Sequence, residues 1–175
     1  LKERLDTLAG QGHKALVFSQ FTNDDFGARR IAAEIGPRAL VYAGNLSDRQ
    51  RQEVLERFQT EAATGVLILS VRAGGLGLNL QEASYVLHFD RWWNPSLQAQ
   101  AESRSHRMGQ RYPVNVYTYT CEGTIEERIE QILECKRALF DELVDEVSLD
   151  ISRVLSRAEL FGLFGLRPPI RHKDC

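Results

Sequence analysis

The sequence predicts an α/β fold in which a parallel β-sheet is flanked by helices on both faces. Short runs rich in β-branched and aromatic residues alternate with stretches of helical periodicity, which is typical of strands joined by helices. The run "VLILS" at 66–70 is apolar almost throughout. A strand of this kind is buried on both faces, so we expect it in the middle of the sheet.

The individual elements follow from runs of strand-forming residues and from signals for helix starts. The predicted strands are 15–19, 39–42, 66–70, 85–89 and 114–120. Ser47 with Gln50, and Thr124 with Glu127, have the spacing of capping boxes. In such a box two side chains satisfy free amides of the first helical turn. Helices are therefore expected to begin at these two places.

Three helical segments are predicted toward the C-terminus. Asparagine and proline at 94–95, with a glycine at 109, bound a helix over 95–108. A longer helix starts at Thr124, and its apolar residues face either the core or a partner. A last short helix, "SRAELFGLFGL", has too much apolar surface to be solvated, so we expect it to pack on this domain or brace it against another. The predicted division is 1–145 for the sheet domain and 146–175 for a C-terminal helical brace and tail.

Composition bounds the class of protein. The chain has 175 residues, enough for one domain with a real core and an appendage. Its three cysteines lack any short paired spacing, which favours a reducing compartment over a disulfide framework or a zinc site, and no metal site is predicted. No apolar run approaches the roughly 20 residues of a membrane span. The charged start "LKERLDTLAGQGHK" is unlike a signal peptide.

Two arginines in "RSHRMGQ" are candidates for a phosphate site. Arg104 and Arg107 lie three residues apart, which places both guanidinium groups on nearly one face of a helix. Guanidinium grips phosphate oxygens through paired hydrogen bonds. The structural alternative is a helix cap, or an ion pair with the nearby Glu102. None of the four lysines follows a glycine, so the sequence has no Gly-Lys-Ser/Thr phosphate loop. A nucleotide bound by these arginines needs the rest of its site from elsewhere.

The loop "SVRAGGLGLNL" leaves the predicted central strand at its carboxyl end, where ligands of open parallel sheets gather. Its glycines at 74, 75 and 77 allow close approach of a phosphate or of another backbone, although they also suit simple loop hinges. The dinucleotide-binding pattern fails because Leu80 takes the place of the third glycine. Trp92 and Trp93 follow a strand end; packing is their commoner fate, and stacking on nucleic acid is the alternative.

Four stretches, in order, carry a resemblance to a known family. They are "ALVFSQFT", "YAGNLSDRQRQEVLERFQ", "GVLILSVRAGGLGLNLQEASYVLHFDRWWNP" and "QAQAESRSHRMGQRYPVNVYTYTCEGTIEERI". These stretches resemble the second-lobe motifs of Swi/Snf-type (Snf-two family) DNA-dependent ATPases of helicase superfamily II, over roughly residues 14 to 145. The resemblance implies a RecA-like lobe, the second of two, with ATP in the cleft between the lobes and double-stranded DNA across both.

The resemblance also implies roles for individual residues. Arg104 and Arg107 match arginine fingers on the γ-phosphate, and Gly75, Gly77 and Gln100 match the nucleotide side. The positions that match DNA-facing residues are Ser19, Gln20, Gly44, Asn45, Ser70, Val71, Arg72, Ala73, Gly74 and Trp93. The family usually has aspartate before the first finger arginine, whereas this chain has serine at 103, so the acidic support of that arginine is changed.

The implied function is that of the second motor lobe of an ATP-dependent translocase or remodeller acting on double-stranded DNA. ATP with Mg would be bound mainly by the N-terminal RecA-like lobe of the same protein, outside this chain. The chain alone is therefore expected to be inactive. A protein–DNA complex is the expected kind of remodelling substrate, and no membrane is expected. The expected location is inside the cell and on DNA, in a bacterial or archaeal cytoplasm or nucleoid, or in a nucleus.

Two alternative functions stay open on the sequence. A strand-separating superfamily II helicase would need a separation pin, and nothing in the sequence resembles one. A stand-alone, non-catalytic lobe would bind DNA or protein only. Gly-Lys-Thr and Asp-Glu motifs in the sequence before Leu1 would favour the motor, and their absence would favour the stand-alone lobe.

Overall fold

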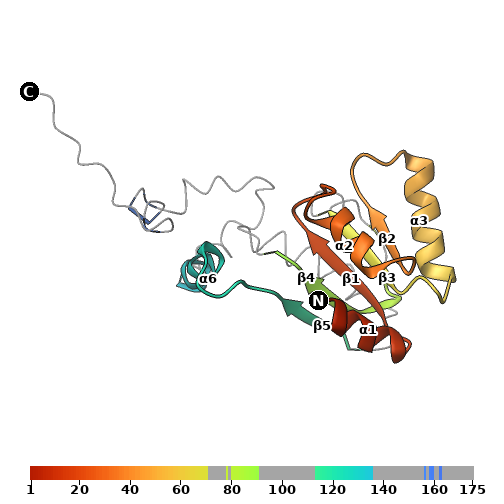
Figure 1. The fold of residues 1–175 in the computed structure, drawn as a ribbon, viewed down its shortest axis with the longest axis horizontal. Coiled ribbons are helices and arrows are strands. Elements are labelled where there is room, and N and C mark those ends of the chain that lie inside the picture. The colour runs from red at the N-terminus through yellow and green to blue at the C-terminus, as the bar shows by residue number, and fades with distance from the viewer. Residues whose placement is uncertain are drawn as a thin grey trace, which may run out of the picture. The chain divides into compact units, whose positions relative to one another are not determined.

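The computed structural model describes residues 1–70, 78, 80–90, 113–135, 156, 158, 159 and 162. The elements in this part of the chain are α1 (Lys2–Gly10), β1 (Lys14–Ser19), α2 (Ala28–Ile35), β2 (Ala39–Tyr42), α3 (Asp48–Thr60), β3 (Val66–Ser70), β4 (Ala83–His88), β5 (Asn115–Thr118) and α6 (Ile125–Cys135) (Figure 1). The predicted helix over 95–108 and the predicted boundary at residue 145 lie outside the described residues. Within the described ranges, every helix is too short or too polar to cross a membrane.

The five strands form one parallel sheet in the order β2-β3-β1-β4-β5, which confirms the predicted fold class. All five predicted strands are present, with ends that shift by no more than two residues. The expectation that β3 is the middle strand was wrong, because β1 occupies the centre and β3 lies beside it. Burial along a whole strand shows that it is an inner strand but does not give its position in the strand order. Strand β1 is also buried, from Ala15 to Ser19.

Alternate residues of the strands build a core on each face of the sheet, as the period of two requires. Leu16 and Phe18 of β1 belong to a cluster that Phe58 of α3 completes. Val17 of β1 belongs to a second cluster on the opposite face, where the buried residues of α1 and α2 meet the sheet. Helices therefore cover both faces of the sheet, with α3 on one and α1 and α2 on the other.

The start of α3 is a capping box, as predicted. Ser47 Oγ accepts the N–H of Gln50 at 3.3 Å, and Gln50 Oε1 accepts the N–H of Ser47 at 2.9 Å. Each bond satisfies an amide that has no partner within the helix. The capping box therefore fixes the residue at which α3 begins.

The chain divides into two compact units, of which the first comprises Leu1–Trp92 and Leu97–Tyr119 and the second Trp93–Ser96 and Thr120–Cys175. The capping box predicted for α6, in the second unit, is not formed. The Glu127 carboxylate accepts the N–H of Gly123 at 3.1 Å, one residue before Thr124. Gly123 has a φ of 69°, so the chain turns just before the helix and presents the amide of Gly123 instead.

The last predicted helix lies in the second unit and is described at four positions. Ser156 and Glu159 form a capping box at its start, with bonds of 2.7 Å from the N–H of Ser156 to Glu159 Oε2 and 3.3 Å from the N–H of Glu159 to Ser156 Oγ. The carbonyl of Gly162 accepts a hydrogen bond of 3.4 Å from Arg128 of α6. This segment therefore contacts α6.

Candidate functional site

The carboxyl ends of the parallel strands meet at one edge of the sheet, and two neighbouring strands end there in serine. Ser19 of β1 and Ser70 of β3 are partners in the register of the sheet. Ser19 is fully buried and Ser70 is 6% exposed. A hydroxyl buried to this degree needs a hydrogen-bond partner, which for Ser19 comes from the neighbouring strand on the other side.

That partner is Asp90, which follows β4 and is itself buried. Its Oδ2 accepts a hydrogen bond of 2.5 Å from Ser19 Oγ. Both carboxyl oxygens of Asp90 also accept the backbone N–H of Gln20, each at 3.0 Å. Ser19 Oγ in turn accepts the N–H of Phe21 at 3.2 Å. The carboxyl group thus holds Ser19 and Gln20 directly, and Phe21 through the Ser19 hydroxyl.

The cluster of Ser19, Gln20 and Asp90 lies where the connections of the sheet diverge. From β1 the chain runs through α2 to β2 on one side, whereas β5 lies beside β4 on the other side. In open α/β sheets, ligands bind outside the carboxyl ends of the two strands at which the connections part. Phe18 and His88 are register partners just before the cluster, and their rings stack at 5.6 Å.

The segment after Gln20 closes into a compact loop. The N–H of Ala28 donates to the carbonyl of Phe21 at 2.9 Å. Gly27 has a φ of 86°, and a Cβ at this position would lie 2.4 Å from the carbonyl oxygen of Phe21. Only glycine meets both conditions. The loop that follows Gln20 therefore has a defined shape.

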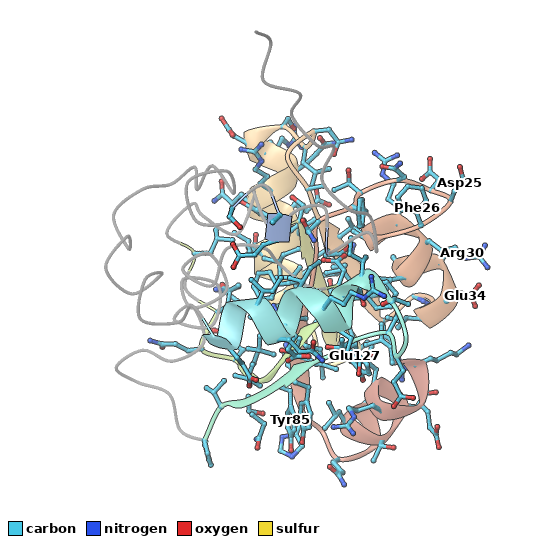
Figure 2. All side chains as sticks on the ribbon, turned by 90° about the vertical axis from the view of Figure 1, so that its left-hand side faces the viewer. Asp25, Phe26, Arg30, Glu34, Tyr85 and Glu127 are labelled. Carbon is cyan, nitrogen blue, oxygen red and sulfur yellow. The ribbon has the colours of Figure 1, made fainter. Side chains whose placement is uncertain are left out.

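The same loop carries exposed aromatic and acidic side chains. The rings of Phe21 and Phe26 meet edge to face at 5.3 Å, with 47% and 50% of the two residues exposed. Figure 2 shows Asp25 and Phe26 at the outer end of the loop, and Arg30 and Glu34 on the outer side of α2. Arg30 and Glu34 pair at 2.6 Å. Because acidic and basic groups are mixed here, the loop by itself does not form a basic surface for phosphates.

The predicted DNA-facing pair after β2 is exposed and has a cation beside it. Gly44 and Asn45 both lie at the surface. The carbonyl of Gly44 accepts a hydrogen bond of 2.8 Å from Arg51 Nη2 of α3. Arg51 Nη1 also lies 3.4 Å from Asp48 Oδ1, so the guanidinium group is held between the turn and the helix.

The structure places five predicted site residues at the carboxyl ends of three adjacent strands, namely Ser19, Gln20, Gly44, Asn45 and Ser70. The other predicted site residues lie outside the described residues: Val71, Arg72, Ala73, Gly74, Gly75, Gly77, Trp93, Gln100, Arg104 and Arg107. All the residues predicted to contact the nucleotide therefore stay predictions. Some of the residues predicted to face DNA have a defined geometry.

Two residues of this site were not predicted from the sequence. Asp90 had a signal, because a carboxylate directly after a buried strand in "YVLHFD" needs donors from a neighbouring strand end. Arg51 had none, since the helix pattern does not separate it from the arginines at 49 and 57. Among the described residues, no group of three or more histidine, cysteine or acidic side chains could hold a metal ion.

A hollow of about 560 Å³ lies between α1 and strands β4 and β5, and none of the predicted site residues line it. Tyr85 and Tyr117 stack nearly parallel at 6.4 Å, and the Arg4 guanidinium carbon lies 4.1 Å from the centre of the Tyr117 ring. The hydroxyl of Tyr119, a third ring of this hollow, is buried and makes no hydrogen bond within the described structure.

Comparisons with known proteins agree with this geometry. Residues 1–109 match the family model of the helicase conserved C-terminal domain. The chain is 42% identical over 127 residues to the DNA repair protein RAD5 of Cryptococcus neoformans, an alignment that covers 72% of the chain and 11% of RAD5. The chain spans less than a fifth of the length of such curated relatives.

Two solved structures from Sulfolobus solfataricus are similar in both sequence and fold. The SWI2/SNF2 ATPase core domain is 32% identical with a TM-score of 0.72, covering 95% of this chain and 34% of that one. The SWI2/SNF2 ATPase core in complex with double-stranded DNA is 33% identical with a TM-score of 0.64, covering 87% and 33%. The chain therefore belongs to the helicase conserved C-terminal domain family, as a C-terminal RecA-like lobe of the SWI2/SNF2 type.

Proposed function

We propose that this chain is the second motor lobe of an ATP-dependent translocase or remodeller that acts on double-stranded DNA. The observation that carries the proposal is the cluster at the carboxyl ends of β1 and β4 in a lobe of the SWI2/SNF2 type. Ligands of open α/β sheets bind at such a divergence of connections. Ser19 and Gln20, which match DNA-facing positions of the family, lie there.

On the DNA side, the exposed surface at Gln20, Gly44 and Asn45 faces the phosphates, while the backbone N–H of Gln20 donates inward to Asp90. Gln20 follows β1, whereas Gly44 and Asn45 follow β2. Strand β3, which ends in Ser70, lies between these two strands. A related ATPase core was solved with double-stranded DNA, which supports DNA as the ligand of this edge. Contacts of this kind carry no sequence information, so binding is expected to ignore base sequence and to weaken with salt.

On the nucleotide side, Arg104 and Arg107 act as fingers on ATP bound mainly by the N-terminal RecA-like lobe, with Gly75, Gly77 and Gln100 completing the contacts from this chain. Mg accompanies the ATP on the first lobe. Charge that spreads over the γ-phosphate oxygens in the transition state is stabilised by guanidinium. Because the fingers and the phosphate loop lie on different lobes, hydrolysis requires the lobes to close, and DNA that spans both favours closure.

The helical brace and tail over 146–175 pack on this lobe or brace it against the N-terminal lobe. The contact between Arg128 and the carbonyl of Gly162 supports packing of the tail on α6. Amide exchange of the tail should slow further when the N-terminal lobe is present, if the tail braces the two lobes. Equal, fast exchange in both proteins would rule bracing out.

The experiment that tests the proposed function compares the isolated chain with the full-length protein that contains it. ATP hydrolysis is measured with and without two duplexes of unrelated sequence, each at low and high salt. We expect hydrolysis stimulated equally by both duplexes in the full-length protein, loss of stimulation at high salt, and no hydrolysis by the isolated chain. DNA binding without any stimulated hydrolysis in the full-length protein would favour the stand-alone binding lobe instead.

A further inference from the structure

The buried carboxyl group of Asp90 has a place in the site that the assignments above do not use. We propose that Asp90 is a positioning residue, which holds the backbone at Gln20 in the conformation that meets DNA and thereby sets how tightly DNA engages the motor. The inference rests on the proposed function, because it takes the segment after β1 as a DNA contact.

The Ser19 hydroxyl faces Asp90 and not the surface. Ser19 is 0% exposed, and its hydroxyl donates inward to Asp90 at 2.5 Å. Gln20, the next residue, is exposed, and its backbone N–H also points to Asp90. The surface of this segment is therefore Gln20, supported from beneath by Ser19 and Asp90.

Both oxygens of Asp90 are held by the segment that leaves β1. Its Oδ2 takes a hydrogen bond of 2.5 Å from Ser19 Oγ, and both oxygens lie 3.0 Å from the N–H of Gln20. Asp90 is only 6% exposed, so water does not replace these donors readily. Removing one partner of a buried hydrogen bond leaves the other partner unsatisfied, which costs more than an exposed bond would. Asp90 therefore restricts the Ser19–Gln20 backbone through several buried hydrogen bonds at once.

Loss of the carboxylate should release this backbone into several conformations. Apparent affinity for DNA falls in proportion to the fraction of molecules that keep the competent conformation. ATP is bound mainly by the other lobe, so the apparent KM for ATP should stay unchanged when the affinity for DNA falls. A split between DNA affinity and nucleotide affinity is thus the signature of positioning at this site.

The test uses Asp90→Asn, Asp90→Ala and Ser19→Ala in the full-length protein, with Ser84→Ala as the matched control. Ser84 is also a buried serine, but it lies at the start of β4, the end opposite to Asp90, where its hydroxyl is 3.3 Å from His13 Nδ1. For each variant, the duplex DNA concentration that gives half-maximal stimulation of ATP hydrolysis, the KM for ATP and the thermal midpoint are measured.

We expect the half-saturating DNA concentration to rise about tenfold for Asp90→Ala and less for Asp90→Asn, which keeps one acceptor for the N–H of Gln20. Ser19→Ala should resemble Asp90→Asn, and the double variant Ser19→Ala with Asp90→Asn should be no worse than the poorer single one. Ser84→Ala should lower the thermal midpoint without moving the half-saturating DNA concentration.

Two outcomes separate this inference from the proposed function. If wild-type hydrolysis is stimulated by DNA and the folded Asp90 and Ser19 variants keep the wild-type half-saturating concentration, the positioning role is wrong while the motor stands. If wild-type hydrolysis is not stimulated by DNA at all, the proposed function itself fails. Should the Asp90 variants not fold, Ser19→Ala removes the same bond from its other partner and decides the question alone.

Discussion

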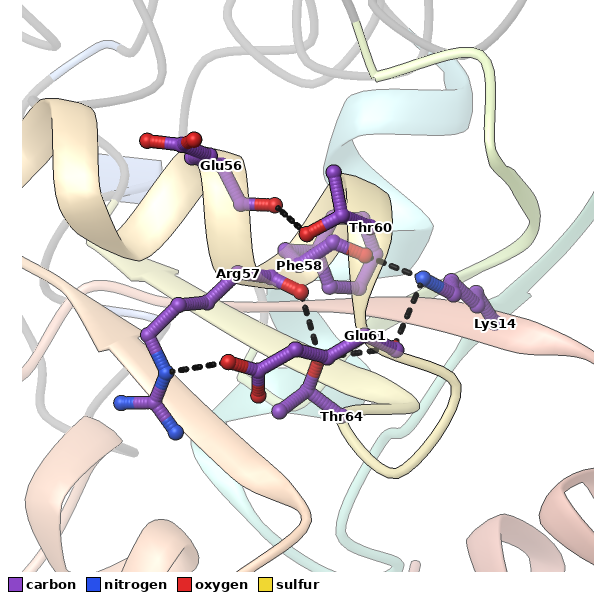
Figure 3. Close-up of polar contacts among 7 residues, drawn as sticks. All are labelled: Lys14, Glu56, Arg57, Phe58, Thr60, Glu61 and Thr64. Atoms are coloured by element: carbon purple, nitrogen blue, oxygen red, sulfur yellow. Dashed lines mark hydrogen bonds and ion pairs between the residues drawn. The ribbon is translucent and has the colours of Figure 1, made fainter.

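Lys14 Nζ donates a hydrogen bond of 3.2 Å to the backbone carbonyl of Glu61, which ties the first residue of β1 to the end of α3 (Figure 3). The same ammonium group also donates to the carbonyls of Phe58 and Gln59. Thr64 Oγ1 bonds the carbonyl of Glu61 as well, at 3.0 Å. Side chains therefore satisfy the carbonyls of Phe58 and Gln59 in the last turn of α3 and that of the C-cap residue Glu61.

Lys14→Met should lower the free energy of unfolding by about 1 to 2 kcal/mol, because it removes a cation and several donors from a helix C-terminus while keeping an apolar stem. Chemical denaturation of the isolated chain measures this. Lys2→Met, at an exposed position of α1, is the control. Equal stability of the Lys14 and Lys2 variants would show that the carbonyls of α3 do not depend on Lys14.

Ser47→Ala should cost about 1 kcal/mol of unfolding free energy, since the capping box of α3 loses its hydroxyl acceptor. Glu53→Ala, on the exposed middle of the same helix, serves as the control and should change stability by a few tenths of a kcal/mol at most. The two variants are compared by thermal and chemical denaturation. A loss no larger for Ser47→Ala than for Glu53→Ala would contradict the capping role.

Gly27→Ala should destabilise the chain by at least about 1 kcal/mol, because the φ of 86° disfavours a side chain and the added Cβ meets the backbone of Phe21. Gly10→Ala is the control, as a Cβ there meets nothing within 4 Å. Gly10 ends α1, so alanine there should be neutral or stabilising. Unchanged stability of Gly27→Ala would mean that the loop after β1 adopts another shape.

Tyr119→Phe should leave stability unchanged or raise it, because the buried Tyr119 hydroxyl makes no hydrogen bond within the described structure. Burial raises the pKa of Tyr119 above its ordinary value of 10.0, against the opposing effect of Arg4. The unfolded chain therefore releases this proton first as the pH rises past 10.0, and the native state loses stability there.

The measurement for Tyr119→Phe is unfolding free energy as a function of pH. Below pH 10.0 the variant should be at least as stable as the wild type, and above it the variant should lose less stability than the wild type. Tyr117→Phe is the matched control, because Tyr117 stacks in the same hollow and is partly exposed. Clear destabilisation of Tyr119→Phe at neutral pH would mean that its hydroxyl has a partner in solution.

The strands were predictable because each is a short apolar run between turn signals. The predicted strand ends differ little from those in the structure. The helices α1 and α2 were not predicted. For α2 a signal was present in the spacing of Ala28, Ile31 and Ile35, which that helix buries on one side. Gly27 is the N-cap residue of that helix, and its positive φ turns the chain into α2 at Ala28.

The sequence predicted only those residues of the candidate site that belong to a single recognised motif. Ser19, Gln20 and Ser70 were identified because they end or follow strands in recognised motifs. Asp90 was not, since its role depends on β4 lying beside β1, and the order of strands in a sheet is set by packing and connections rather than by any one stretch of sequence. The inward direction of the Ser19 hydroxyl was out of reach for the same reason.

The most direct test of the central claim is the turnover number of ATP hydrolysis by full-length protein carrying Arg107→Ala, at saturating duplex DNA. The finger assignment predicts a loss of about 10³ to 10⁵ in turnover, with nearly unchanged DNA affinity, because the lost contact is to the nucleotide across the cleft. If Arg107 only caps its helix or pairs with a nearby acid, the variant loses about 1 kcal/mol of stability or less. Near-normal turnover in the folded variant would contradict the account.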